Sequence, residues 1–118
     1  MGMIDITAKT ITKRIAQASG QIILSDAAAD AIRQKTNPKG DVLTIAEITA
    51  LQAAKNCSVL LPLCHPLAIE HVSVEFELSG FVVHVKAQVA CFAKTGVEME
   101  ALVAVQSALL CIYDMSKI

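Results

Sequence analysis

The sequence predicts an α+β domain in which helices cover one face of an antiparallel sheet. The segment from Lys94 to Ile118 carries charge only at its ends and has the pattern of one long apolar helix. Residues 71–92 alternate apolar and polar side chains on both sides of a short turn, as a half-buried β-hairpin does. The 118 residues suffice for one hydrophobic core, so we expect a single domain over residues 1–118.

The first part of the chain contains one ambiguous segment and one short helix. Apolar residues in Thr12 to Leu24 recur at helical spacing, but Gly20 and a β-branched pair near the end favour a strand. Periodicity alone leaves that choice open. Ser25 is a good N-cap for a helix from Asp26 to Lys35, which the breaker at residues 36–38 would end.

A second helix is expected from about Val42 to Cys57. Asp41 follows a tight Pro-Lys-Gly turn and can accept the free N–H groups of the first helical turn. The apolar residues that we assign to one face of this helix are Ile45, Ile48, Leu51 and Ala54. Lys39 lies beside the helix N-terminus, where proteins commonly bind phosphate, although an ordinary exposed turn lysine fits equally well.

Residues 60–67 read LLPLCHPL, and the two prolines keep this segment out of regular structure. His65 is therefore held by a stiff loop, which is either a substrate-orienting element or a packed corner. The four cysteines form no CxxC pair, and we expect them to be reduced. A zinc site of Cys57, Cys64, His65 and His71 would match no common ligand spacing, so we predict no metal site.

The hairpin follows this loop. The inward-facing residues of its first strand, His71 to Leu78, are expected to be Val72, Val74, Phe76 and Leu78. Ser79 and Gly80 are predicted to form a two-residue turn. The residues expected on one face of the return strand, Phe81 to Phe92, are Phe81, Val83, Val85, Ala87, Val89 and Cys91.

The long helix is predicted to begin with a capping box formed by Thr95 and Glu98. Glu98 and Glu100 lie roughly 200° apart around a helix, so one can cap while the other faces a site. At the far end, the spacing of Asp114 and Lys117 allows an ion pair; a solvated helix end is the simpler alternative. The helix is apolar nearly all round, so we expect it to be covered on several sides by a sheet, another helix or a partner subunit.

The amino-acid composition argues against several classes of binding partner. Hydrophobic residues make up 54% and charged residues 18%, which is little charge for a small monomer and suggests subunit contacts. The net charge is −1 and aromatic residues are 3%, so a nucleic-acid groove is not supported. The start has no leader pattern, and we find no apolar run near the roughly 18 residues of a membrane span. We expect a cytoplasmic protein with neither membrane nor nucleic-acid partners.

Four separated motifs carry a resemblance to a known family. They are PKGDV at residues 38–42, LCHPL at 63–67, AKTGVEMEAL at 93–102 and IYDMSK at 112–117. In this order and spacing they resemble the cyclic pyranopterin monophosphate synthases of molybdenum cofactor biosynthesis. The resemblance implies a ferredoxin-like fold, with a strand at the ambiguous segment. It also implies a homo-oligomer, a hexamer built as a trimer of dimers, with the active site at a subunit interface.

The resemblance further implies a lyase. Its small-molecule substrate would be the triphosphate of a cyclic dihydro-GTP, which is converted to cyclic pyranopterin monophosphate with release of pyrophosphate. No cofactor and no metal are implied. The catalytic positions fall on Lys39, Asp114 and Lys117; the two lysines would balance triphosphate charge, and Asp114 would hold Lys117 or transfer a proton. The substrate-binding positions fall on Leu63, Cys64, His65, Glu98, Met99 and Glu100.

The chain departs from the family pattern near Ile118. Ser116 stands where the family usually has cysteine, Ile118 stands where it has alanine, and the family's chain usually continues further. We therefore expect the last strand of the sheet to be missing from these residues, with one sheet edge unpaired. The alternative function is a non-catalytic, shortened family member that keeps the oligomer surface and binds a purine nucleotide.

Overall fold

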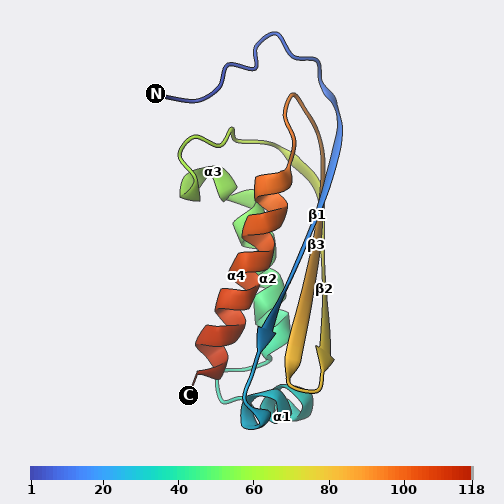
Figure 1. Cartoon of the computed structure of the whole chain (residues 1–118), viewed down its shortest axis with the longest axis vertical. Coiled ribbons are helices and arrows are strands. Elements are labelled where there is room, and N and C mark those ends of the chain that lie inside the picture. Colours follow the sequence, from blue (N-terminus) through green and yellow to red (C-terminus); the bar gives the residue numbers. More distant parts are fainter. Residues whose placement is uncertain (118) are drawn as a thin grey trace.

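The computed structural model describes residues 1–117 and has the α+β architecture of a ferredoxin-like fold (Figure 1), which confirms the predicted fold class. Three strands form one sheet in the order β1-β3-β2, and both outer strands run antiparallel to β3. The elements are β1 (Thr12–Ile23), α1 (Asp26–Gln34), α2 (Val42–Lys55), α3 (Cys57–Leu60), β2 (Ile69–Ser79), β3 (Val82–Ala93) and α4 (Glu98–Ser116).

Helices α2 and α4 lie on the same face of this sheet (Figure 1). Helix α4 packs against α2, β1 and β3, while α2 also contacts β2. The buried residues of the central strand are Val83, Val85, Ala87, Val89 and Cys91, as the alternation predicted. Their neighbours His84 and Lys86 are exposed on the other face, so one side of the sheet carries the core and the other does not.

The ambiguous segment is strand β1. It pairs with β3 along its whole length, from Thr12 opposite Ala93 to Ile23 opposite Val82. Gly20 lies under α4, and a Cβ atom there would meet the side chains of Val105 and Leu109 at 3.0 Å. The absence of a side chain therefore allows a close approach between strand and helix. Periodicity alone left helix and strand open for this segment. Its pairing with β3 shows that it is a strand, as the resemblance implied.

The hairpin turn is one residue later than predicted. Ser79 pairs with Val82, so the two turn residues are Gly80 and Phe81. Phe81 is 49% exposed and does not belong to the buried face of β3, which corrects its assignment. Its carbonyl oxygen instead accepts the N–H of Leu24 at 2.8 Å, so contacts outside the hairpin help to fix the turn.

Both predicted N-caps of the first two helices are confirmed. The Ser25 hydroxyl accepts the N–H of Ala28, and the Asp41 carboxylate accepts the N–H of Thr44 at 3.3 Å. Helix α2 ends at Lys55, two residues before the predicted end. Cys57 begins the short helix α3, which the sequence analysis did not predict.

The buried face of α2 consists of small residues. Its buried side chains are Val42, Ala46, Ala50 and Ala54. They pack in one core cluster with Ala104 and Ala108 of α4, and such small side chains let two helix axes approach closely. Ile45 and Ile48, two members of the face that we had assigned, are 37% and 53% exposed. Two of the three large apolar residues of that predicted face therefore point outward.

The predicted capping box of α4 is wrong. The helix begins at Glu98, Val97 occupies the N-cap position, and no side chain caps it. The Glu98 carboxylate folds back towards Gly96 instead. The sheet and α2 cover only part of this helix. Large exposed residues on its outer side are Met99, Leu102, Leu110 and Tyr113.

By length and apolar composition alone, α4 could cross a membrane, contrary to our expectation that no segment approached such a span. In the structure the helix packs against the sheet and α2, and its buried residues belong to the core. A core helix of a globular domain has the same length and composition, so this property does not by itself indicate a membrane.

Candidate active site

The predicted site residues form two groups at opposite ends of α4. The lysine-end group consists of Lys39, Asp114 and Lys117. The loop-end group consists of Leu63, Cys64, His65, Glu98, Met99 and Glu100. Glu98 and Asp114 both lie on α4, about 24 Å apart at 1.5 Å per residue. A single chain therefore cannot bring the two groups to one small substrate.

In the lysine-end group, two ammonium groups surround one acid. Lys117 Nζ lies 3.1 Å from one carboxylate oxygen of Asp114, which confirms the predicted ion pair. Lys39 Nζ donates a hydrogen bond to the backbone oxygen of Asp114 at 3.0 Å and lies 4.0 Å from the other carboxylate oxygen. Two cations and one anion leave a net positive charge, which suits an anionic ligand.

Asn37 holds the Lys39 turn against the end of α4. Its side-chain nitrogen donates to the backbone oxygen of Met115 at 2.8 Å, and its side-chain oxygen accepts the N–H of Lys39 at 2.9 Å. Gly40 closes the turn with φ +123°, a conformation that favours glycine. The sequence analysis treated Asn37 only as a helix breaker. An asparagine at the start of a Pro-Lys-Gly turn was the available signal, because its side chain often bonds to nearby backbone.

The lysine-end group is accessible, and its cations act on the pKa of Asp114. The hydrogen bond from Lys117, followed by the charges of Lys39 and Lys117, lowers the pKa of Asp114 below its usual value. The side chains of Lys39, Asp114 and Lys117 are 42%, 61% and 51% exposed. Ion pairs at such exposure add little stability, so these groups can exchange their partners for a ligand.

A cavity of about 660 Å³ lies at the other end of α4. Its lining includes five members of the loop-end group, namely Leu63, Cys64, His65, Glu98 and Met99. The N-terminal segment before β1 supplies Ile4 and Ile6 to the same wall. His65 Nε2 lies 2.8 Å from the backbone oxygen of Ile4, which fixes the ring against that segment. Figure 1 shows this segment, α3 and the start of α4 at the same end of the molecule.

Glu100, the sixth member, does not line the cavity. It is 2% exposed, and the Cys64 thiol donates to one of its carboxylate oxygens at 3.8 Å. Burial raises the pKa of Glu100. Glu98, two residues earlier, is exposed, so the prediction that the two acids lie on different faces is confirmed.

Two cysteines lie beside this buried acid. Cys57 Sγ and Cys64 Sγ are 3.9 Å apart. Burial raises the pKa of Cys57 to about 12, and the charge of Glu100 adds to the effect. The pKa of Cys64 is raised by the same two causes. The zinc combination considered from the sequence does not form, since neither His65 nor His71 joins the two thiols; Glu100 does.

The two ends of α4 offer different chemistry. The lysine end offers positive charge to phosphate and an acid that can orient or exchange a proton. The loop end offers a largely apolar cavity with a few polar groups, the usual character of a small-molecule site. Among known protein families, the model described as the MoaC family matches residues 3–118, almost the whole chain. The chain therefore belongs to the MoaC family and to molybdenum cofactor biosynthesis.

Proposed function

We propose that this chain converts the triphosphate of a cyclic dihydro-GTP into cyclic pyranopterin monophosphate and pyrophosphate. One observation carries the proposal. Residues that match the family's motifs form a group of two lysines around one acid and a cavity, one at each end of the same helix. A triphosphate joined to a fused ring system has two corresponding parts, one strongly anionic and one an uncharged ring system.

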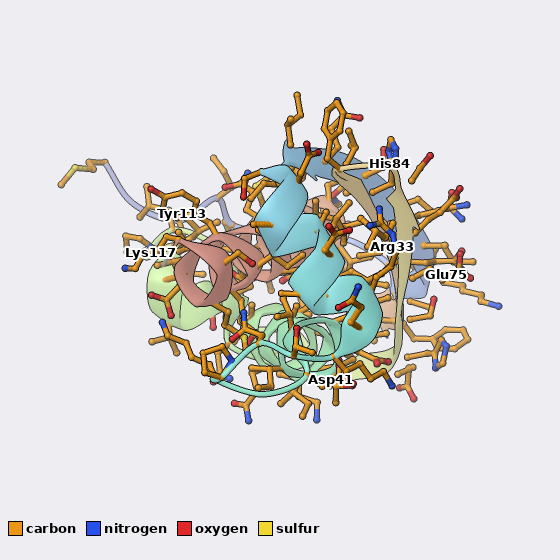
Figure 2. All side chains as sticks on the ribbon, turned by 90° about the horizontal axis from the view of Figure 1, so that it is seen from below. Arg33, Asp41, Glu75, His84, Tyr113 and Lys117 are labelled. Atoms are coloured by element: carbon orange, nitrogen blue, oxygen red, sulfur yellow. The ribbon has the colours of Figure 1, made fainter. Side chains whose placement is uncertain are left out.

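The proposed active site is assembled from two chains. If two copies pack α4 against α4 in opposite directions about a two-fold axis, the lysine end of each copy meets the loop end of its partner. The outer side of α4 supports this arrangement, because Leu110 is 68% exposed and Tyr113 is 57% exposed. Figure 2 shows Tyr113 and Lys117 projecting on the opposite side of the molecule from Glu75 of β2, hence away from the sheet.

The lysine end would act on the phosphates. Lys39 and Lys117 would neutralise the triphosphate and the developing charge on the leaving pyrophosphate. In doing so, their ammonium groups would exchange contacts with Asp114 for contacts with phosphate oxygens. Asp114, ionised and within one helical turn of Lys117, would orient that lysine or accept a proton as the ring is rebuilt.

The loop end would hold the ring system. The cavity of about 660 Å³ is large enough for a fused ring with its sugar. His65 offers a ring nitrogen held by the Ile4 carbonyl, and Met99 offers a polarisable apolar surface. Holding the ring here and the phosphates at the partner's lysine end would align the inner phosphorus for cyclisation.

We extend the proposal to a hexamer formed as a trimer of such dimers, working in the cytoplasm. Exposed apolar residues on the outer face of the sheet support further association. They are Ile15, Ile23 and Phe92. Free cysteines throughout the described residues agree with a reducing compartment.

The direct test is turnover by the purified chain. The chain is incubated with the cyclic dihydro-GTP triphosphate, and both pyrophosphate and the cyclic pterin phosphate are quantified while the mass in solution is measured. We expect both products in equal amounts from an oligomer, and far less of either product from the Asp114→Ala chain. An intact oligomer that binds the substrate but forms neither product would refute the activity.

A further inference from the structure

Three potential metal ligands converge behind the wall of the loop-end cavity. Cys57 comes from the start of α3, Cys64 from the proline-flanked loop and Glu100 from the first turn of α4. The two sulfur atoms are 3.9 Å apart, and Cys64 Sγ is 3.8 Å from Glu100 Oε2. All three ligand atoms lie within 4.8 Å of one another. Three elements far apart in sequence thus place their ligand atoms around one point.

The buried acid lacks adequate partners within residues 1–117. Glu100 is 2% exposed, and its Oε1 atom has no hydrogen-bond partner there. None of the ion pairs formed by these residues involves it. Its other oxygen accepts only a thiol, which is a weak donor. A carboxylate in this position is costly unless a cation or a strong donor compensates it.

Two of the three separations between ligand atoms match the edges of a tetrahedral zinc site, and the third, between Cys57 and Glu100, is within 4.8 Å. With Zn–S near 2.3 Å and Zn–O near 2.1 Å, tetrahedral angles place two sulfur ligands about 3.8 Å apart, and sulfur and oxygen about 3.6 Å apart. The observed separations of 3.9 Å and 3.8 Å need only small movements to reach these values. Two thiolates and one carboxylate also form a ligand set that zinc accepts.

We propose that Cys57, Cys64 and Glu100 bind one thiophilic divalent cation, Zn²⁺ being the natural occupant, with a fourth position left for water or another small ligand. The ion would join the loop that carries Cys64 and His65 to the first turn of α4. It would thereby fix one wall of the cavity from behind. The Cys57-x6-Cys64 spacing and the distant Glu100 explain why no sequence pattern indicated the site.

This inference does not depend on the proposed reaction, and its test needs no substrate. The full chain is reduced, freed of metal by chelation and dialysis, and titrated with Co²⁺ under anaerobic conditions. We expect one Co²⁺ per chain, with a thiolate-to-cobalt charge-transfer band, visible bands of tetrahedral cobalt, and displacement by added Zn²⁺. The absence of the charge-transfer band would overturn the proposal.

Matched variants locate the ligands. Cys57→Ala and Glu100→Gln should each weaken Co²⁺ binding by more than roughly tenfold, since even groups that only support a ligand are worth that much. Cys57→Ala should also lose charge-transfer intensity, whereas Glu100→Gln should keep it at saturation. Cys111→Ala is the control, because Cys111 lies near the other end of α4 and contacts Met115. An undiminished band in Cys57→Ala would overturn the assignment.

A measurement on the unmodified chain covers the case in which Cys57→Ala does not fold. X-ray absorption of the Zn²⁺-loaded protein should reveal two sulfur neighbours at about 2.3 Å, together with lighter oxygen neighbours. A first shell of nitrogen and oxygen alone would refute the site.

Discussion

The two ends of α4 differ in almost every physical property. The lysine end is charged and exposed, and its neighbouring cations lower the pKa of Asp114. The loop end is recessed and largely apolar. Its buried acid, Glu100, lies beside two thiols, and burial raises its pKa. The lysine end consists of flexible side chains next to a turn that Asn37 holds against α4. The loop end consists of a stiff loop and the start of α4.

In the proposed reaction, the two ends would have different tasks. Exposed cations can rearrange around phosphates at little cost, because water screens the contacts that they give up. A recessed cavity can select a ring by shape, because its walls are already formed. Neither end has both exposed cations and a preformed cavity, and about 24 Å of helix separates the two ends in one chain.

Replacing the acid of the lysine end should have the largest effect. We expect Asp114→Ala to lower turnover by roughly a hundredfold to ten-thousandfold, the usual size of an acid–base contribution, with little change in substrate affinity. Steady-state kinetics would measure both quantities. Asp30→Ala is the control, because Asp30 forms a comparable exposed ion pair with Arg33, outside the candidate site. A loss of affinity alone would contradict a proton-transfer role for Asp114.

Mixing two inactive variants should restore activity if the two ends work across a subunit interface. Asp114→Ala damages the lysine end and His65→Ala the loop end. Random dimers of the two would retain about one quarter of the wild-type sites, since each mixed dimer keeps one intact pair of ends. Product formation after subunit exchange measures the recovery. Asp114→Ala mixed with Lys117→Ala, both damaged at the same end, should recover nothing.

Removing one cation should weaken anion binding more modestly. We expect Lys39→Ala to reduce the affinity for pyrophosphate roughly tenfold, the worth of one charge-assisted hydrogen bond, and to change thermal stability little. Calorimetric titration and a melting curve give the two numbers. Lys35→Ala is the matched control, since Lys35 pairs with Asp41 near the same turn. Unfolding of the Lys39→Ala chain would show that Lys39 is structural instead.

The smallest effect concerns pH. The pKa of Asp114 lies below its usual value of 3.8 in the folded chain, so its ionised form favours folding. This contribution is complete above the unfolded pKa and is lost as the pH falls through the folded pKa. Wild type should therefore melt slightly above Asp114→Asn at pH 7, and the gap should close below about pH 4. A gap that stays constant down to pH 2 would contradict the shift.

The sequence predicted those features that local chemistry determines. Ser25 and Asp41 were identified as caps because a helix start has free N–H groups whatever surrounds it. Alternation identified β2 and β3, since each has one face on the core. Features set by packing were harder to predict. The outward position of Ile45 and Ile48 depends on how closely alanines bring α2 to α4, which no single helix reveals.

The candidate site shows the same limit. Motif matching named its residues, but only the fold separates them into two ends. The contact of Asn37 with α4 was not predicted, and Cys57 was considered only in a zinc combination with histidines, because Met115 and Glu100 are distant from them in the sequence. Asn37 bonds to Met115, and Cys57 lies beside Cys64 and near Glu100. Such contacts cross between elements, and periodicity carries no information about them.

The end of α4 obtains its capping from a segment about 75 residues earlier in the chain. Lys117 at the C-cap position has φ −78°, so no left-handed residue closes the helix there. Asn37 and Lys39 instead donate to the free carbonyls of Met115 and Asp114. The turn and the last helical turn should therefore open and close as one cooperative unit in hydrogen exchange. The arrangement of Lys39, Asp114 and Lys117 would then be either fully formed or fully open, and a phosphate would not encounter a partly formed site.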